Sequence, residues 1–240
     1  MKKKKIVLII CIILITIQMF MTFIIKIDIE KYTVKNAKIP EAFNNLKIVQ
    51  LSDFHSKGYR NTTEKIISKI KKINPDIIVM TGDMVSYDMT GREEFEKLVK
   101  ELSKIYPIYY IDGNHEHLAE KLTPGEYLFL MEFLKELGVI TIKNDYVEIY
   151  KGNESINLYG VNIPLDWPSG VYVNKLQLER DYVEKTLPEA DADKFNILLA
   201  HNPIFIKQYS KWGANLVLAG HMHGGIVRIP FTNIGLLSPE

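Results

Sequence analysis

The chain has 240 residues, of which 47% are hydrophobic and 25% are charged, values that fit one ordinary globular domain with an additional segment. Its net charge of +1 argues against a general affinity for nucleic acid, because nucleic-acid-binding domains usually carry a strong basic bias. The single cysteine, Cys11, excludes a disulfide framework or a thiolate metal site within one chain.

Residues 1–30 are expected to form a membrane anchor. Four lysines follow Met1, and the run from Ile6 to Ile25 contains no charged residue. About 20 apolar residues span a bilayer core. No small-residue cleavage site follows the run, so we predict an uncleaved anchor, with a cleaved signal peptide as the alternative. The positive-inside rule then predicts a single-pass protein of the cell membrane, with residues 31–240 on the extracytoplasmic side.

Residues 31–43 are expected to form an extended entry strand and a loop, and the rest of the chain alternates between apolar runs and helical patterns. Short β-branched runs predict buried strands, and apolar residues at helical spacing predict crossover helices. The expected strands are 46–51, 77–81, 108–111, 139–143, 146–150, 155–161, 195–200 and 214–219. The expected helices are 62–73, 92–105, 125–137, 175–185 and a segment ending near 212.

Polar side chains follow three of these strands at similar intervals. Asp53 and Asp83 are 30 residues apart, and Asp83 and Asn114 are 31 apart. Each interval matches one strand-helix-strand unit of about 30 residues. Right-handed crossovers return the chain to the same edge of a parallel sheet. The three clusters are therefore predicted to meet at the carboxyl edge, where open α/β sheets bind ligands.

Five of the six histidines also follow predicted buried strands. Only His117 does not, and it is interpreted as a surface residue, with contact to the substrate as the alternative. A lone histidine after a strand is more often a loop residue than a metal ligand. Five histidines together with two aspartates and an asparagine, however, form a donor set that suits divalent ions of Zn, Mn, Fe, Co or Ni. Two ions sharing one carboxylate can clamp a displacement at phosphorus. The seven candidate metal ligands are Asp53, His55, Asp83, Asn114, His201, His221 and His223.

These residues resemble a family signature. The ordered motifs are similar to those of the calcineurin-like metallophosphoesterases, and the anchor resembles the bacterial membrane-anchored or exported branch. The resemblance covers about residues 48–225 and implies an α/β fold, the four-layer α/β/β/α sandwich with two mixed sheets, in which 139–161 joins the second sheet. The motifs are Asp53-Phe54-His55, Gly82-Asp83, Gly113-Asn114-His115-Glu116, His201 and Gly220-His221-Met222-His223.

The resemblance also implies roles. Asp83 bridges two metal ions, of which one is also held by Asp53, His55 and His223 and the other by Asn114, His201 and His221. A metal-bound hydroxide attacks phosphorus. His115 is the catalytic residue that contacts the phosphate or protonates the leaving oxygen, and Asp112 and Glu116 orient histidines.

One departure from the family concerns the end of the chain. Relatives usually continue with strands that complete the second sheet, whereas this chain ends at Glu240. Residues 226–229 are therefore expected to form an edge strand without its neighbour, as in a chain truncated at its carboxyl terminus.

The predicted activity is metal-dependent hydrolysis of a phosphoester, with manganese among the candidate metals. The anchor, and a resemblance to UDP-diacylglucosamine hydrolases, favour a phosphodiester or a lipid-linked pyrophosphate. Nucleotides and cell-wall phosphodiesters remain open as substrates. A catalytically silent metal-binding or scaffold module is the first alternative and a nuclease the second. No protein partner is evident, and residues 162–172 are expected to shape the substrate pocket.

Overall fold

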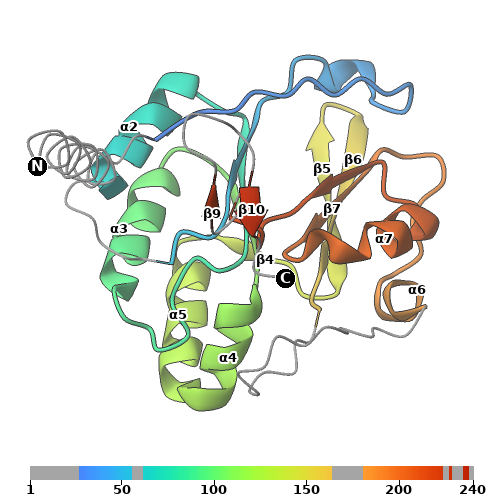
Figure 1. Cartoon of the computed structure of the whole chain (residues 1–240). Coiled ribbons are helices and arrows are strands. Elements are labelled where there is room, and N and C mark those ends of the chain that lie inside the picture. The colour runs from blue at the N-terminus through green and yellow to red at the C-terminus, as the bar shows by residue number, and fades with distance from the viewer. Residues whose placement is uncertain (1–26, 56–61, 164–180, 224–226, 229–234, 238–240) are drawn as a thin grey trace, which may run out of the picture.

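The computed structural model describes residues 27–55, 62–163, 181–223, 227–228 and 235–237. Two four-stranded sheets pack face to face, and helices cover the outer side of each (Figure 1). Helices α2 to α5 lie against the first sheet, and α6 and α7 lie against the second. The chain thus has a mixed α/β fold built largely from parallel strands.

The first sheet is built from crossover units. Its order is β1-β2-β3-β4, and all of its pairings are parallel. Its strands are β1 (Ile48–Leu51), β2 (Ile77–Thr81), β3 (Ile108–Ile111) and β4 (Ile140–Thr141). Its helices are α2 (Thr62–Ile73), α3 (Arg92–Leu102), α4 (Asn114–Leu122) and α5 (Pro124–Glu136).

The second sheet has the order β5-β6-β7-β8, with β5 antiparallel to β6 and the other pairings parallel. Its strands are β5 (Asp145–Lys151), β6 (Glu154–Val161), β7 (Asn196–Ala200) and β8 (Leu216–Leu218). The helices beside it are α6 (Tyr182–Thr186) and α7 (Ile206–Trp212), and the short 3-10 turns are η1 (Glu41–Phe43) and η2 (Pro203–Phe205).

Side-chain alternation along the strands creates three apolar layers. In β2, Ile77 and Val79 face the second sheet, whereas Ile78 and Met80 face the helices of the first, because successive residues of a strand point to opposite faces. In β7, Leu198 belongs to the layer beneath α6 and α7. These layers fix the sheets so that β2 lies against β7 and β3 against β6.

Most predicted elements are confirmed, but four expectations are wrong. The segment 139–161 does not lie wholly in the second sheet, because β4 follows crossover helix α5 and pairs in parallel with β3 of the first sheet. The first sheet is therefore parallel rather than mixed. The segment 31–43 contains no strand, only η1. Strand β9 (Val227–Arg228) has a neighbour, the antiparallel β10 (Gly235–Leu237).

Two sequence predictions fall on parts that the structure does not describe. The apolar run of the expected anchor lies within residues 1–26, outside the described residues. Within the described ranges, no helix is both long enough and apolar enough to cross a membrane. Residues 164–180, which include most of the expected pocket loop and the start of the helix predicted at 175–185, also lie outside them.

Candidate active site

Side chains at the carboxyl ends of strands from both sheets meet in one cluster. Asn114 follows β3 and His201 follows β7. Oδ1 of Asn114 lies 3.0 Å from Nε2 of His201, so the ends of these two strands are in contact. The structure thus brings together all eight residues that the sequence singled out as metal ligands or catalytic. Ligand atoms lie within 4.8 Å of one another in three groups: Asp53, His55 and His223; His55, Asp83 and His115; and Asp83, His201 and His221.

Five residues of this cluster have left-handed backbone conformations. A non-glycine residue in this region costs roughly 1–3 kcal/mol and persists only where its surroundings fix it. Two backbone hydrogen bonds between the loop after β1 and the loop after β2 help to hold these conformations. The N–H of Asp53 donates to the carbonyl of Gly82 at 3.1 Å, and the N–H of His55 donates to the carbonyl of Asp83 at 3.0 Å. The φ angles are 53° at Asp53, 49° at His55, 52° at Asp83, 72° at His221 and 51° at His223.

The buried ring of His201 defines one half of the cluster. Its Nδ1 lies 2.7 Å from the carbonyl oxygen of Thr81, which can only accept, so Nδ1 carries the hydrogen. In the neutral ring, Nε2 therefore presents a lone pair. That atom lies 3.0 Å from Asn114 Oδ1, 3.1 Å from His221 Nδ1 and 3.2 Å from Asp83 Oδ2. Four electron-rich atoms thus converge on one point, as they do around a cation.

The pKa values of His201 and Asp83 also show that this part of the cluster favours a positive charge. Burial disfavours the charged form of each group, but their mutual hydrogen bond and attraction outweigh it. The pKa of His201 rises to about 9, and the pKa of Asp83 falls to about 2. A proton on His201 and a bound cation would therefore compete for the same position.

Asp53, His55 and His223 form the other half. Nε2 of His223 lies 3.3 Å from Nε2 of His55 and 3.4 Å from Oδ1 of Asp53. The backbone N–H of His221 donates to both carboxylate oxygens of Asp53 at 3.0 Å and holds that carboxylate in place. Burial lowers the pKa of His55 to about 4, although Asp83 opposes the shift. The ring is thus neutral at neutral pH, as a metal ligand must be.

The donor set of both halves fits divalent cations. Imidazole nitrogens and carboxylate oxygens are the ligands that Zn, Mn, Fe, Co and Ni share. Asp83 belongs to two of the three groups, so its carboxylate can reach an ion in either half.

His115 is held differently from the other histidines. Its Nδ1 accepts a hydrogen bond from the backbone N–H of Tyr87 at 3.2 Å. The hydrogen of the neutral ring is therefore on Nε2, which lies 3.9 Å from Asp83 Oδ2. This tautomer directs an N–H group into the cluster. The contribution of Tyr87 gave no sequence signal, because only its backbone takes part.

Glu116 does not orient a histidine, contrary to the sequence prediction. It is fully buried, and its carboxylate accepts four backbone N–H groups. Oε2 accepts from Asp83 and Gly113, both at 2.8 Å, and Oε1 accepts from Met84 at 2.7 Å and Val85 at 3.1 Å. The carboxylate therefore ties the loop after β2 to the start of α4. A glutamate at the third position of a helix is a capping-box signal that could have indicated this role.

Asp112, which was also predicted to orient a histidine, makes no hydrogen bond to a histidine ring among the described residues. Its Oδ2 accepts from the hydroxyl of Tyr127 at 2.8 Å. Burial raises the pKa of Asp112, and the nearby charges of His117 and Lys143 act against that rise. His117 itself is not a surface residue, because only 15% of its side chain is exposed.

Glycine at two positions allows the ligand loops to touch. A Cβ atom on Gly113 would lie 2.3 Å from Asp83 Oδ1, and a Cβ atom on Gly220 would lie 1.8 Å from Ser52 Oγ and 2.5 Å from Asp53 Oδ2. Any larger residue would displace the two carboxylates.

Comparison with known proteins places the chain in a family. The model of the calcineurin-like phosphoesterase family matches residues 46–225, more than half of the chain. The "Uncharacterized metallophosphoesterase YkuE" of Bacillus subtilis is 29% identical over 210 residues, which are 85% of this chain and 68% of that protein. An "Uncharacterized metallophosphoesterase" of Aquifex aeolicus is 29% identical over 204 residues, 83% of this chain and 70% of that protein.

A vertebrate relative is also similar. The "Transmembrane protein with metallophosphoesterase domain" of Danio rerio is 26% identical over 212 residues, 83% of this chain and 45% of that protein. The family match covers every residue of the cluster from Asp53 to His223. The chain therefore belongs to the calcineurin-like phosphoesterase family and is a metallophosphoesterase, a phosphoric ester hydrolase.

Proposed function

We propose that the chain is a dinuclear metal-dependent phosphohydrolase. The observation that carries the proposal is the position of Asp83, whose Oδ2 lies 3.2 Å from His201 Nε2 and 3.9 Å from His55 Nε2. One carboxylate between two groups of nitrogen and oxygen donors is the arrangement that two ions sharing a ligand require. Two ions about 3.5–4 Å apart can clamp both the attacking and the leaving oxygen at phosphorus.

Each half of the cluster supplies its own ligands. Asp53, His55 and His223 would hold one ion, and Asn114, His201 and His221 would hold the other, with Asp83 between them. Ions bound there would lower the pKa of water and stabilise the charge that develops on the phosphate oxygens.

The protein's own residues would manage orientation and proton transfer. In the hydrolysis, the oxygen of water bonds to phosphorus while the bond from phosphorus to the leaving oxygen breaks. His115, whose Nδ1 accepts from Tyr87, would donate an Nε2–H hydrogen bond to the phosphate or to the leaving oxygen, which takes its proton from water. Glu116 would keep the Asp83 and Asn114 loops in register through its four backbone contacts.

The test is turnover of a chromogenic phosphate diester and a chromogenic monoester by the full chain in detergent, first with manganese and then with chelator. We expect chelator-sensitive turnover and a loss of at least about 100-fold in Asp83→Asn, as for other removals of a transition-state interaction. Asp88→Asn, a change at an exposed residue of the same loop, should leave the rate unchanged. Wild-type turnover in Asp83→Asn, or none in a folded, manganese-loaded wild type, would reject the proposal in favour of a scaffold module.

The substrate and the location form a finer part of the proposal. We infer a membrane-tethered enzyme acting on a phosphodiester or a lipid-linked pyrophosphate, because the run from Ile6 to Ile25 is long enough to span a bilayer core. Labelling of lysines after residue 30 by a membrane-impermeant reagent on intact cells is the expected result. Complete protection of those lysines, with labelling restored after lysis, would place the domain in the cytoplasm instead.

A further inference from the structure

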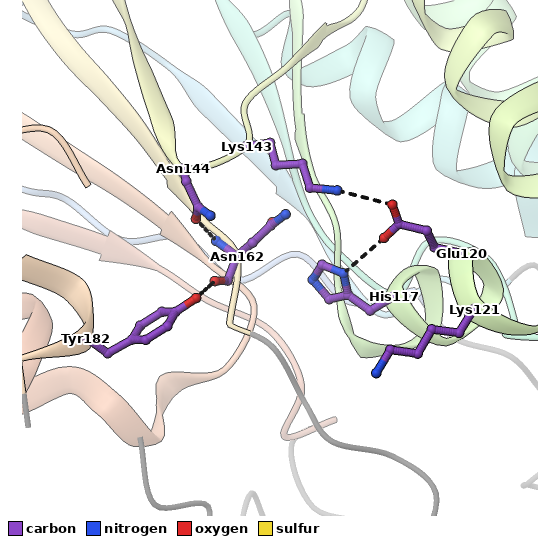
Figure 2. A pocket seen from close by; sticks show the side chains of 7 residues that line it. All are labelled: His117, Glu120, Lys121, Lys143, Asn144, Asn162 and Tyr182. Carbon is purple, nitrogen blue, oxygen red and sulfur yellow. Dashed lines mark hydrogen bonds and ion pairs between the residues drawn. The ribbon is translucent and has the colours of Figure 1, made fainter. Parts of the chain in front are cut away.

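A cavity lined by polar residues lies beside the candidate metal site and is not explained by the proposed mechanism. Its volume is about 260 Å³, and its lining includes His117, Glu120 and Lys121 of α4 and Lys143, Asn162 and Tyr182 from segments across the opening (Figure 2). One ordered water needs only about 10–15 Å³ of such volume. Whole small-molecule ligands occupy about 300–1,000 Å³. The cavity is therefore suited to one group of a larger ligand.

The topology places this cavity next to the reacting centre. Lys143 follows β4, which is the neighbour of β3, and Asn162 follows β6, which is the neighbour of β7. The carboxyl ends of β3 and β7 carry Asn114 and His201. Adjacent strands are about 4.8 Å apart, so the cavity continues the same edge of both sheets by one strand.

Helix α4 gives a second measure of this proximity. Asn114 is the first residue of α4 and His117 is the fourth. Residues three apart lie on the same helix face, separated by about 4.5 Å along the axis. A ligand whose phosphate lies at Asn114 would extend into the cavity within a few bonds.

The lining of the cavity includes Asn162, whose side chain lacks a hydrogen-bond partner among the described residues. The residue is only 5% exposed, and neither Oδ1 nor Nδ2 of its side chain has a hydrogen-bond partner among the described residues. Its backbone is fully engaged, because its N–H donates to Asn144 Oδ1 at 2.8 Å and its carbonyl accepts from Tyr182 at 3.0 Å. Figure 2 shows the side chain directed away from Tyr182, toward the side of His117 and Lys143.

Such a buried, unpartnered carboxamide is costly. Each buried polar group without a partner costs about 1–3 kcal/mol, and native proteins contain only a few of them. A fixed backbone holding an unused donor and an unused acceptor at a cavity therefore points to a ligand that supplies both partners.

The charges around the cavity disfavour a simple anion. Nζ of Lys143 pairs with Glu120 Oε1 at 3.5 Å, and Nδ1 of His117 lies 4.0 Å from Glu120 Oε2. The buried carboxylate of Asp112 interacts with His117 and Lys143 as well. Positive and negative groups are thus mixed, and the lining offers both donors and acceptors. Hydroxyl groups match such a surface because each both donates and accepts.

We propose that the cavity lined by His117, Lys143 and Asn162 binds a hydroxyl-rich group, a sugar or another polyol, that is esterified to the phosphate cleaved at the metal cluster. The inference rests on the proposed phosphohydrolase function and narrows its substrate class. Both polar atoms of the Asn162 side chain are buried in the ligand-free chain, so the carboxamide would rotate to place its donor and its acceptor on two hydroxyls, while Lys143 and Glu120 contact others at the rim.

The test compares glucose 1-phosphate and glycerol 1-phosphate with methyl phosphate as competitive inhibitors of chromogenic turnover by the manganese-loaded full chain. We expect each polyol phosphate to bind at least about tenfold more tightly than methyl phosphate, since one or two buried hydrogen bonds separate them. Asn162→Leu should bring this ratio close to one without changing the inhibition constant of methyl phosphate. Asn153→Leu, at an exposed turn, should keep the ratio.

Two further measurements separate recognition from folding. Lys143→Met alters an exposed residue and should lower the ratio in a protein that melts like the wild type. Asn162→Leu should melt no lower than the wild type, because it removes unpartnered polar atoms. Equal inhibition by methyl and polyol phosphates, or an equal loss of both in Asn162→Leu, would overturn the polyol site and leave the phosphohydrolase standing.

Calorimetry keeps the two proposals distinguishable. If the wild type turns over no chromogenic ester, the phosphohydrolase proposal fails, and the same phosphates can be titrated into the manganese-loaded chain. Tighter binding of glucose 1-phosphate than of methyl phosphate, lost in Asn162→Leu, would still support the cavity as a polyol site. Equal heats for both ligands would reject it.

Discussion

The carboxylate of Glu116 accepts the backbone N–H of Asp83 at 2.8 Å. The same carboxylate accepts from Met84, Val85 and Gly113, so one buried side chain satisfies four donors from two ligand loops. Hydrogen bonds to an ionised acceptor are about twice as strong as neutral ones. The position of Asp83, which lies in two of the three ligand groups, therefore depends on a residue that is not itself a ligand.

We expect Glu116→Gln to destabilise the protein and weaken metal binding together. Glutamine keeps one acceptor oxygen but presents an amide group to N–H donors that need an acceptor. Leaving such donors unsatisfied should cost about 3 kcal/mol, or roughly 6–12 °C in melting temperature for a chain of this size. Thermal unfolding with and without manganese measures both effects. Glu136→Gln, at an exposed position of α5, is the control and should match the wild type.

Gly113→Ala should disrupt the metal cluster through a single methyl group. The added Cβ would lie 2.3 Å from Oδ1 of Asp83, so the carboxylate must move. Because Gly113 has φ −105°, alanine can adopt the backbone and the effect is steric. We expect manganese affinity to fall at least about tenfold, in the range reported for disturbed outer contacts of metal ligands. Gly125→Ala is the matched control, since nothing lies within 4 Å of its added Cβ; unchanged affinity in both variants would contradict the prediction.

His115→Gln should separate catalysis from metal binding. Loss of a hydrogen-bond donor to the charge that develops in the transition state typically lowers the rate by about 100- to 1,000-fold. The decrease should be larger for esters with an alkyl leaving group than for p-nitrophenyl esters, because p-nitrophenolate leaves without protonation. Metal content, measured by elemental analysis, should stay at the wild-type value. Equal rate losses for both leaving groups would indicate that His115 donates its hydrogen bond to the phosphate rather than to the leaving oxygen.

The metal-free protein should lose stability as pH rises from 6.5 to 9. The pKa of His201 is about 9 in the folded chain and about 6.5 when unfolded. A group with a raised pKa stabilises the fold fully below its unfolded pKa, and that contribution disappears as pH passes the folded value. His55, with a pKa of about 4, does not titrate in this window. Glu116, with a pKa of about 7, adds to the decline only up to that pH.

Urea unfolding at pH 6.5 and pH 9 measures this effect. With chelator present, the free energy of unfolding should fall by about 3 kcal/mol over the window. Saturating manganese should abolish most of the decline, because a bound cation replaces the proton on His201. Metal affinity should rise over the same range. A flat profile in chelator would show that His201 is already neutral in the folded chain.

Local pattern and spacing predicted most of the elements and every member of the cluster. Buried parallel strands carry continuous apolar runs, and their carboxyl ends converge by topology. Asp53, Asp83 and Asn114 could therefore be placed together before any coordinates. The positions of their ring and carboxylate atoms could not, because those depend on left-handed backbone angles at residues other than glycine.

Other predictions failed where the partner of a segment was remote. Residues 139–143 pair with β3 and not with β5, and no short-range signal distinguishes these sheets. His117 was interpreted as a surface residue, yet it lines a cavity whose other wall includes Asn162. Burial of a polar side chain depends on what covers it, which sequence spacing does not specify.

The sequence by itself determined which candidate ligands the protein has, in which order they follow the strands, and hence its family. Only the tertiary structure decided which ring nitrogen of His201 and of His115 carries the hydrogen. The partners that decide it are the backbone oxygen of Thr81 for His201 and the backbone N–H of Tyr87 for His115. The same holds for the four donors of Glu116 and the unpartnered amide of Asn162. Every residue has a backbone C=O and every residue except proline has a backbone N–H, so the roles of these groups arise from their position in space and leave no mark on residue identity.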